Sequence, residues 1–283
     1  MKLTQLMHVH SLAKKQNEAT HLVIPTIDMI TFRREIGKKM SELLKENTHN
    51  YAEMKQIVIA DLVSFNKKRD REVSGIQRND IILQRKLANE RANTDDMVQL
   101  TKMEELFRDA YTLLRLPGKG GKFVPILVPP KTMQVIDLMI ADENLKSDHY
   151  FFQTEGGQQH YRSYVILNNF AEEFGLQNKA IFRSTKLRKF LATAAQFLDL
   201  PQHQRQWVAN FLGHDLAVHD KYYRMHTDAV CLAKMTKLLC LVDSGKLKDS
   251  YQMNLDTIQP TLEDENDSVR ALFKSSNNIG PNL

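Results

Sequence analysis

The clearest strand signal in the chain is a pair of short apolar runs, Tyr111 to Leu116 and Phe123 to Val128. The stretch between them, Pro117-Gly118-Lys119-Gly120-Gly121, supplies the residue types that tight turns require, so the pattern predicts a β-hairpin. Pro129 and Pro130 end the second run, because proline cannot continue a strand ladder. Helical spacing dominates the rest of the sequence. We therefore predict a mainly α fold with a small antiparallel β-sheet, in the α+β class.

Apolar residues at helical spacing predict helices along most of the chain. The predicted helices cover Asp28 to Glu46, Asn50 to Phe65, Thr132 to Ile140, Arg162 to Phe174, Lys186 to Leu200, 202 to 212 and Asp228 to Val242. The charged stretch from Asn79 to about Thr101 is predicted to be a surface connection, and Tyr150 to Phe152 a brief strand or a packing segment. For the last predicted helix we favour core packing over other uses.

The predicted organisation has one main domain with shorter flanks. Residues 1–26 form an N-terminal extension that we expect to be poorly ordered, and 27–49 a helix before the main domain, 50–245. The polar tail, 246–283, contains an acidic cluster and is expected to be disordered.

Composition limits the classes of protein that are compatible with the chain. The 283 residues, 42% of them hydrophobic, can bury one good core, and a net charge of +5 suits a polyanionic partner as well as many ordinary proteins. Cys231 and Cys240 lie in one apolar helix, which predicts no disulfide and a reducing compartment. No run approaches the roughly 18 apolar residues of a membrane span, and the opening residues lack a signal-peptide core, so we predict neither membrane insertion nor secretion.

An arginine, a histidine and a tyrosine follow one another in the segment from Ser184 to Arg224. Arg188 offers a planar fork of donors for phosphate oxygens, His214 can exchange a proton, and the Tyr223 phenol can attack phosphorus. This combination indicates phosphate chemistry. His219 and His226 lack a Cys or carboxylate set with ligand spacing, so the sequence predicts no metal site.

Over about residues 50–245 the chain resembles the catalytic domain of tyrosine recombinases, the phage integrase-like enzymes. The family's first arginine lies in an Arg-x-x-Glu-Leu motif followed by an Asp, and Arg69-Asp70-Arg71-Glu72-Val73 with Asp80 is similar. Arg69 is the candidate and Arg71 its rival, with Asp70 as a plausible helix N-cap. A simpler alternative is that the whole run from Asn66 to Arg71 is a solvated helix cap or a nuclear-targeting patch.

The hairpin carries the second likeness. Its sequence from Gly118 to Pro125 resembles the family's Gly-Lys-Gly turn before a strand that ends in Val-Pro, which implies that Lys119 protonates the leaving 5′-oxygen. The alternative is a glycine turn with solvated lysines. A P-loop is not matched, because no helix follows the loop.

One position departs from the family pattern. Where the family has His-x-x-Arg, this chain has Thr185-Lys186-Leu187-Arg188, which retains the arginine and replaces the histidine. We favour Thr185 as a helix N-cap. Loss of one transition-state donor costs roughly 10²- to 10³-fold in rate, and Lys186 or Lys189 can supply compensating charge.

The last likeness is the Leu212-Gly213-His214 turn and a tyrosine after it. The interval from His214 to Tyr223 matches the family's spacing to the nucleophile, whereas Tyr222 is one residue short and is predicted to pack. Adjacent residues on a helix point about 100° apart, so both cannot face one phosphate.

The resemblance, closest to eukaryotic crypton-like recombinases of transposable elements, implies a nuclear protein that binds double-stranded DNA. It implies strand cleavage and rejoining through a 3′-phosphotyrosyl intermediate, without a cofactor. The implied catalytic residues are Arg69, Lys119, Arg188, His214 and Tyr223, and the implied DNA-binding residues are Lys122, Lys186 and Lys189. It also implies oligomerisation on DNA through the helix 228–242, and makes 27–49 the remnant of a DNA-clamp region. The alternative is a catalytically inactive DNA-binding or protein-interaction module on the same fold, because of Thr185 and the short segment before residue 50.

Overall fold

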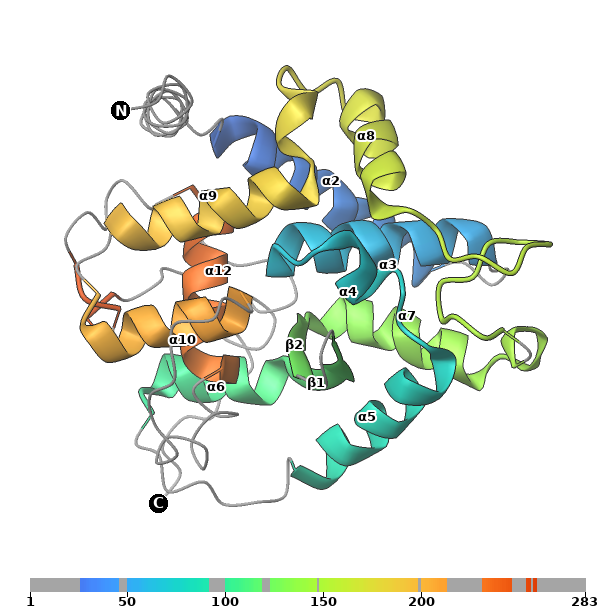
Figure 1. Ribbon diagram of the computed structural model, residues 1–283, viewed down its shortest axis with the longest axis horizontal. Coiled ribbons are helices and arrows are strands. Elements are labelled where there is room, and N and C mark those ends of the chain that lie inside the picture. The colour runs from blue at the N-terminus through green and yellow to red at the C-terminus, as the bar shows by residue number, and fades with distance from the viewer. Residues whose placement is uncertain are drawn as a thin grey trace, which may run out of the picture.

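The computed structural model describes residues 26–45, 50–91, 100–118, 123–146, 148–197, 200–212, 231–245, 253–255 and 257–258 (Figure 1). In chain order the elements are α2 (Thr26–Leu43), α3 (Tyr51–Asn66), α4 (Asp70–Val73), α5 (Arg78–Arg91), α6 (Lys102–Ala110), β1 (Thr112–Pro117), β2 (Phe123–Val128), α7 (Pro130–Ala141), the 3-10 turn η2 (Glu143–Leu145), α8 (Ser163–Glu173), the 3-10 turn η3 (Lys179–Ile181), α9 (Ser184–Phe197), α10 (Gln202–Leu212), the π-helical turn η4 (Cys231–Met235) and α12 (Thr236–Asp243).

The predicted hairpin is present. Strands β1 and β2 pair antiparallel, with Thr112 opposite Val128 and Pro117 opposite Phe123. Among the described residues they form a two-stranded sheet, so the prediction of a mainly helical fold with a small antiparallel sheet is confirmed. Residues 119–122 of the turn lie outside the described residues.

Helix α3 is the centre of the core. Asn50 caps its start by accepting a hydrogen bond from the Glu53 amide at 3.3 Å, and from Met54 to Asn66 nearly every residue is buried. A helix that is apolar all round must be covered on all sides. Figure 1 shows α3 in the middle of the molecule, and it contacts α2, α7, α8 and β2.

The flanking segments contribute to the same core. Helix α2 begins at Thr26, one residue before the predicted 27–49 segment. It buries Phe32, whose ring stacks on Phe182 with centroids 4.4 Å apart. From the predicted tail, Leu255 and Ile258 are also buried in this core. The rest of the predicted N-terminal extension, and most of the tail, lie outside the described residues.

The stretch from Asn79 to Thr101 was predicted to be a connection without regular structure, and this was wrong as far as Arg91, because Arg78–Arg91 is helix α5. Most residues from 79 to 90 do lie at the surface, as predicted. Its residues are mostly good helix formers, and one narrow face packs on β1. Ile81 is buried there, and the Gln84 side chain accepts a hydrogen bond from the Arg115 amide at 3.2 Å. Because only one narrow face of α5 is buried, few of its positions need an apolar residue, and the helical periodicity of the sequence is weak.

Over the described residues, the remaining predicted elements match with small shifts. Residues 46, 198–199 and 228–230 of the predicted helices lie outside the described residues. Tyr150 to Phe152 is a packing segment: Phe151 and Phe152 are buried, and the Phe151 amide donates to the Ile76 carbonyl at 2.8 Å. Helix α8 ends before Gly175, whose φ of 65° suits glycine after a helix. Core packing is confirmed for Thr236 to Val242 of α12, all of which are buried.

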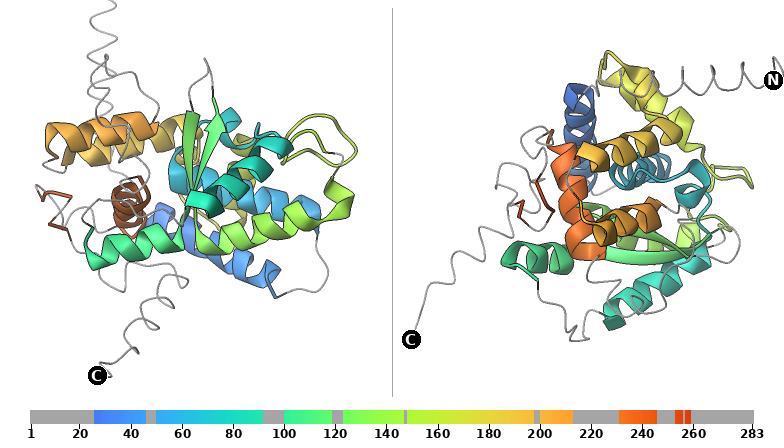
Figure 2. Two further views of the ribbon diagram at one scale, coloured as in Figure 1. Left: turned by 90° about the horizontal axis from the view of Figure 1, so that it is seen from below. Right: turned by 60° about the vertical axis from the view of Figure 1, so that its left-hand side comes forward.

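Helices α9 and α10 lie side by side at one end of the molecule, in Figure 1 and in both views of Figure 2. The turn η4, which leads into α12, contacts α10 and α6. Residues 213–230, between α10 and η4, lie outside the described residues.

Candidate arginine site

Arg69 is held in place by the helix that it begins. It is the N-cap of α4, and its amide donates to Glu72 Oε2 at 2.8 Å while its Nη1 donates to Glu72 Oε1 at 2.8 Å. The prediction that Asp70 is the N-cap was therefore wrong. The Arg69 side chain stays 54% exposed, so its guanidinium remains accessible to a ligand.

Asp70 instead joins α4 to the start of α8. Its Oδ1 accepts hydrogen bonds from the Ser163 amide at 2.6 Å and the Ser163 hydroxyl at 2.5 Å. The Ser74 hydroxyl donates to the same oxygen at 3.0 Å. The carboxylate therefore satisfies an orphan amide at the N-terminus of α8, where negative charge is favourable.

Arg188 approaches the same Glu72 from α9. Its side chain is buried, with a residue exposure of 6%, and its Nη1 lies 3.8 Å from Glu72 Oε2. Burial, and then the neighbouring charge of Arg69, lower the pKa of Arg188, while Glu72 opposes the change. Arg69 and Arg188, far apart in the sequence, are thus brought together on one carboxylate.

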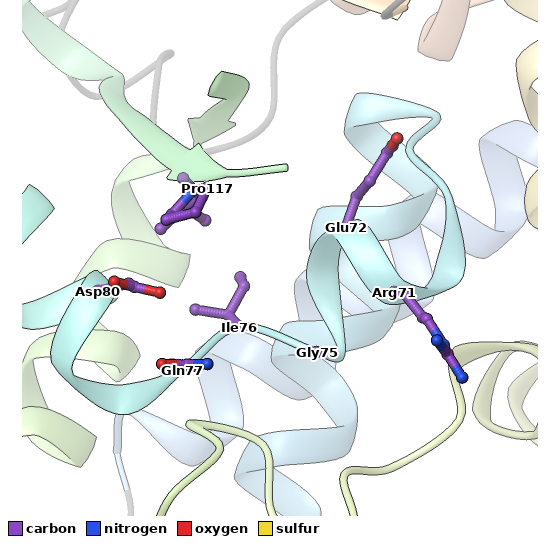
Figure 3. A pocket seen from close by; sticks show the side chains of 8 residues that line it. Arg71, Glu72, Gly75, Ile76, Gln77, Asp80 and Pro117 are labelled. Atoms are coloured by element: carbon purple, nitrogen blue, oxygen red, sulfur yellow. The ribbon is translucent and has the colours of Figure 1, made fainter. Parts of the chain in front are cut away.

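The end of the hairpin lies next to α4. Leu116 and Pro117 line a pocket of about 100 Å³ together with Glu72 and Asp80 (Figure 3). That volume holds a few water-sized groups and is too small for a nucleotide. The pocket does show that the end of β1 lies close to α4. The chain reaches Lys119 two positions after Pro117, but Lys119 and Lys122 lie outside the described residues.

Arg71 takes a different direction from Glu72. Figure 3 shows the two side chains pointing to different sides of α4, and Arg71 is exposed. Because Arg69 is the arginine that contacts the carboxylate shared with Arg188, the geometry favours Arg69 over Arg71 as the partner of Arg188.

The alternative of a wholly solvated basic run from Asn66 to Arg71 was wrong. Lys67 and Lys68 are 0% and 1% exposed. The Lys67 ammonium lies 2.7 Å from Asp243 Oδ1 at the end of α12. The Lys68 ammonium donates to the Phe211 carbonyl near the end of α10 and lies 3.7 Å from the centre of the Phe211 ring. These two lysines therefore tie α3 to the C-terminal helices.

Helix α9 presents different residues to its two sides. Leu187 and Arg188 are buried, whereas Thr185, Lys186 and Lys189 are exposed. The predicted N-cap role of Thr185 was wrong, because α9 begins at Ser184 and the Lys186 amide donates to the Arg183 carbonyl at 2.8 Å. The two predicted DNA-binding lysines lie one helical turn apart on the exposed side.

Besides Lys119, three predicted site residues lie outside the described residues. His214 and Tyr223 follow the last residue of α10, and Lys122 lies in the hairpin turn. Tyr222 is likewise outside the described residues. Glu72 belongs to the sequence motif that resembles the family's first arginine motif, but the sequence did not predict that its carboxylate contacts both arginines. Nothing in the sequence indicated that Lys68 is buried.

Over the described ranges there is no cluster of three or more His, Cys, Asp or Glu side chains that could hold a metal ion. In the same part of the chain, no helix is long and apolar enough to cross a membrane. Comparison with protein-family models, with curated proteins and with solved structures gave no match.

Proposed function

We propose that the chain is a tyrosine recombinase-like DNA-binding protein with the catalytic-domain fold of that family, which cleaves and rejoins DNA strands. The observation that carries the proposal is the meeting of Arg69 and Arg188 at Glu72. Burial, and then the charge of Arg69, lower the pKa of Arg188. Two guanidinium groups this close favour an anion between them, and a DNA phosphate presents oxygens that both can bind.

In the proposed reaction, Arg69 and Arg188 stabilise the charge that develops on the phosphoryl oxygens. The Tyr223 oxygen bonds to phosphorus as the bond from phosphorus to the 5′-oxygen breaks, which leaves a 3′-phosphotyrosyl link. The phenol proton passes to a base, with His214 assisting, and Lys119 protonates the leaving 5′-oxygen. The reaction in this form needs no metal or organic cofactor.

Double-stranded DNA is the proposed partner, with Lys122, Lys186 and Lys189 as phosphate contacts and the nucleus as the location. Exposed lysines along α9 suit binding to a phosphate backbone. Oligomerisation through the helix 228–242 would require exchange between protomers, because Thr236 to Val242 are buried in the chain's own core.

A second candidate function is DNA binding or protein interaction without cleavage on the same fold. Thr185 favours it, because an exposed hydroxyl in the first turn of α9 stands where a catalytic histidine would be expected. A hydroxyl has no positive charge to offer a developing oxyanion.

The two functions are separated by trapping the covalent intermediate. The full chain is incubated with a pool of nicked duplexes of randomised sequence, and protein–DNA adducts that survive denaturation are recovered. The proposal expects adducts that Tyr223→Phe abolishes and the matched variant Tyr222→Phe retains. Salt-sensitive DNA binding with no adduct at any sequence supports the second function. Absence of both adduct and DNA binding contradicts the two proposals together.

A further inference from the structure

We infer that Lys68 is a positioning residue of the proposed phosphate site, holding the C-terminal turn of α10 beside Arg69. This inference rests on the proposed function. It concerns a side chain that contacts no substrate and acts through the placement of α10.

The contacts of Lys68 are internal to the protein. Its side chain is 1% exposed, its ammonium donates to the Phe211 carbonyl, and the same ammonium lies 3.7 Å from the centre of the Phe211 ring. Phe211 is the next-to-last residue of α10, where helix carbonyls lack intrahelical partners and positive charge is favourable. One buried charge thus closes the end of the helix.

Burying an ammonium group is costly, and an apolar side chain of similar size would pack at less expense. The ammonium adds specific contacts that an apolar side chain lacks: a hydrogen bond to one carbonyl and a cation–π contact with one ring. Its neighbour Lys67 contacts a different helix through an ion pair, with Asp243 of α12 at 2.7 Å. The two adjacent lysines therefore hold two different helices against the end of α3.

The position of Lys68 links it to both arginines. Arg69 follows it directly in the chain, and α10 packs on α9, the helix that carries Arg188. A shift of α10 would therefore be passed through α9 to Arg188. It would not disturb the contact between Arg69 and Glu72, because that contact is formed within α4.

Trp207, the single tryptophan of the chain, reports on α10 directly. It is partly buried, and it lies one turn before Phe211 on the same helix. The experiment compares full-length wild type with Lys68→Met, Lys68→Arg and the matched control Lys67→Met. Each protein is tested for acrylamide quenching of Trp207, DNA affinity and the rate of adduct formation at saturating DNA, with circular dichroism to verify folding.

We expect Lys68→Met to raise the quenching constant of Trp207 about 2-fold, because α10 loosens locally. Its adduct rate should fall about 10- to 100-fold, because small displacements near reacting groups are costly. DNA affinity should change less than about 3-fold, and Lys68→Arg should restore part of the rate because it keeps the cation. Lys67→Met should leave Trp207 quenching at the wild-type value.

The inference is overturned if Trp207 quenching in folded Lys68→Met equals that of the wild type, or if Lys67→Met changes it equally. A rate that falls only in proportion to DNA affinity overturns it as well. If the wild type forms no adduct, the proposed cleavage fails, and the quenching comparison alone then decides the role of Lys68. Should Lys68→Met fail to fold, Lys68→Gln replaces it as the variant without the cation and is compared with Lys68→Arg, which keeps the cation.

Discussion

Glu72 is the residue on which the candidate site depends, because its carboxylate contacts both Arg69 and Arg188. A carboxylate between two guanidinium groups holds them at a short separation in the absence of DNA. In the proposed function, the same carboxylate would compete with a DNA phosphate for their donors. An arginine guanidinium can offer a phosphate two parallel donors and a lysine ammonium cannot, so the two residue types are not equivalent at these positions.

We predict that Arg188→Lys lowers the rate of adduct formation by about 10²- to 10³-fold, because a point charge replaces a forked donor at the transition state. The matched control is Lys179→Met, a surface lysine 3.3 Å from Glu172. Single-turnover adduct formation on nicked DNA measures both. A loss below about 3-fold in folded Arg188→Lys would remove Arg188 from the proposed catalytic residues.

Glu104 predicts a pH dependence of stability. Burial raises the pKa of this carboxyl, but the Lys234 ammonium, 2.5 Å away, and hydrogen bonds from Thr101 outweigh burial and lower it below 4.5. A lowered folded-state pKa stabilises the fold above the unfolded value, and this stabilisation is lost as pH falls through the folded value.

Glu104→Gln should therefore destabilise the protein by about 3 kcal/mol at neutral pH, with the difference shrinking as pH falls below the ordinary range of a carboxyl group. The adjacent exposed residue gives the control, Glu105→Gln, with an expected change below about 0.5 kcal/mol. Urea unfolding at several pH values measures both variants. A difference that does not vary with pH would assign the loss to packing alone.

At the scale of the element, α4 is too short to be stable by itself. It has four residues, and an isolated helix needs roughly 12 or more. Two sets of contacts hold it in place. The Glu72 carboxylate accepts from the Arg69 amide at the start of the helix, and the Asp70 carboxylate accepts from Ser163 at the start of α8. The helix that carries the candidate arginine is therefore positioned by side-chain contacts and not by helix propensity.

We expect Asp70→Ala to destabilise the protein by about 1–2 kcal/mol, because the N-terminus of α8 loses its acceptor. Asp109→Ala, an exposed aspartate near the end of α6, is the control and should change stability by less than about 0.5 kcal/mol. Urea midpoints at constant slope provide the comparison. Equal midpoints for the two variants would show that the Asp70 contacts do not stabilise α8.

At the scale of the whole molecule, a buried charge network joins three helices. Arg33 of α2 lies 2.5 Å from Asp61 of α3 and 2.9 Å from Asp243 of α12, and Lys67 also contacts Asp243. Burial alone would lower the pKa of Arg33, but the two carboxylates together raise it above its usual value. Burial lowers the pKa of Lys67, against the effect of Asp243.

Arg33→Met should cost about 3–5 kcal/mol, because it leaves the negative charges of Asp61 and Asp243 buried with one cation fewer. Arg34→Met removes the next residue, whose side chain is 60% exposed, and should cost less than about 0.5 kcal/mol. Thermal or urea unfolding of the two variants measures the contrast. Similar losses would mean that the network does not hold the three helices together.

Prediction from the sequence succeeded where the signal was local. The hairpin was marked by its glycine-rich turn, and α3 and α7 by apolar spacing that a buried helix needs. It failed at α5, because a helix buried along only one narrow face carries little periodicity. It failed also at Lys67 and Lys68, since a basic run looks the same in sequence whether its charges face water or a distant carbonyl.

By itself, the sequence determined most of the helices, the hairpin and the residue types of the candidate site, because these follow from spacing and side-chain chemistry over a few positions. Only the tertiary structure decided that Arg69 and Arg188 share Glu72, and that Lys68 binds the end of α10. Those contacts join residues far apart in the chain, and their existence depends on how α4, α9 and α10 pack. Packing is a property of the whole core, which no short segment of sequence contains.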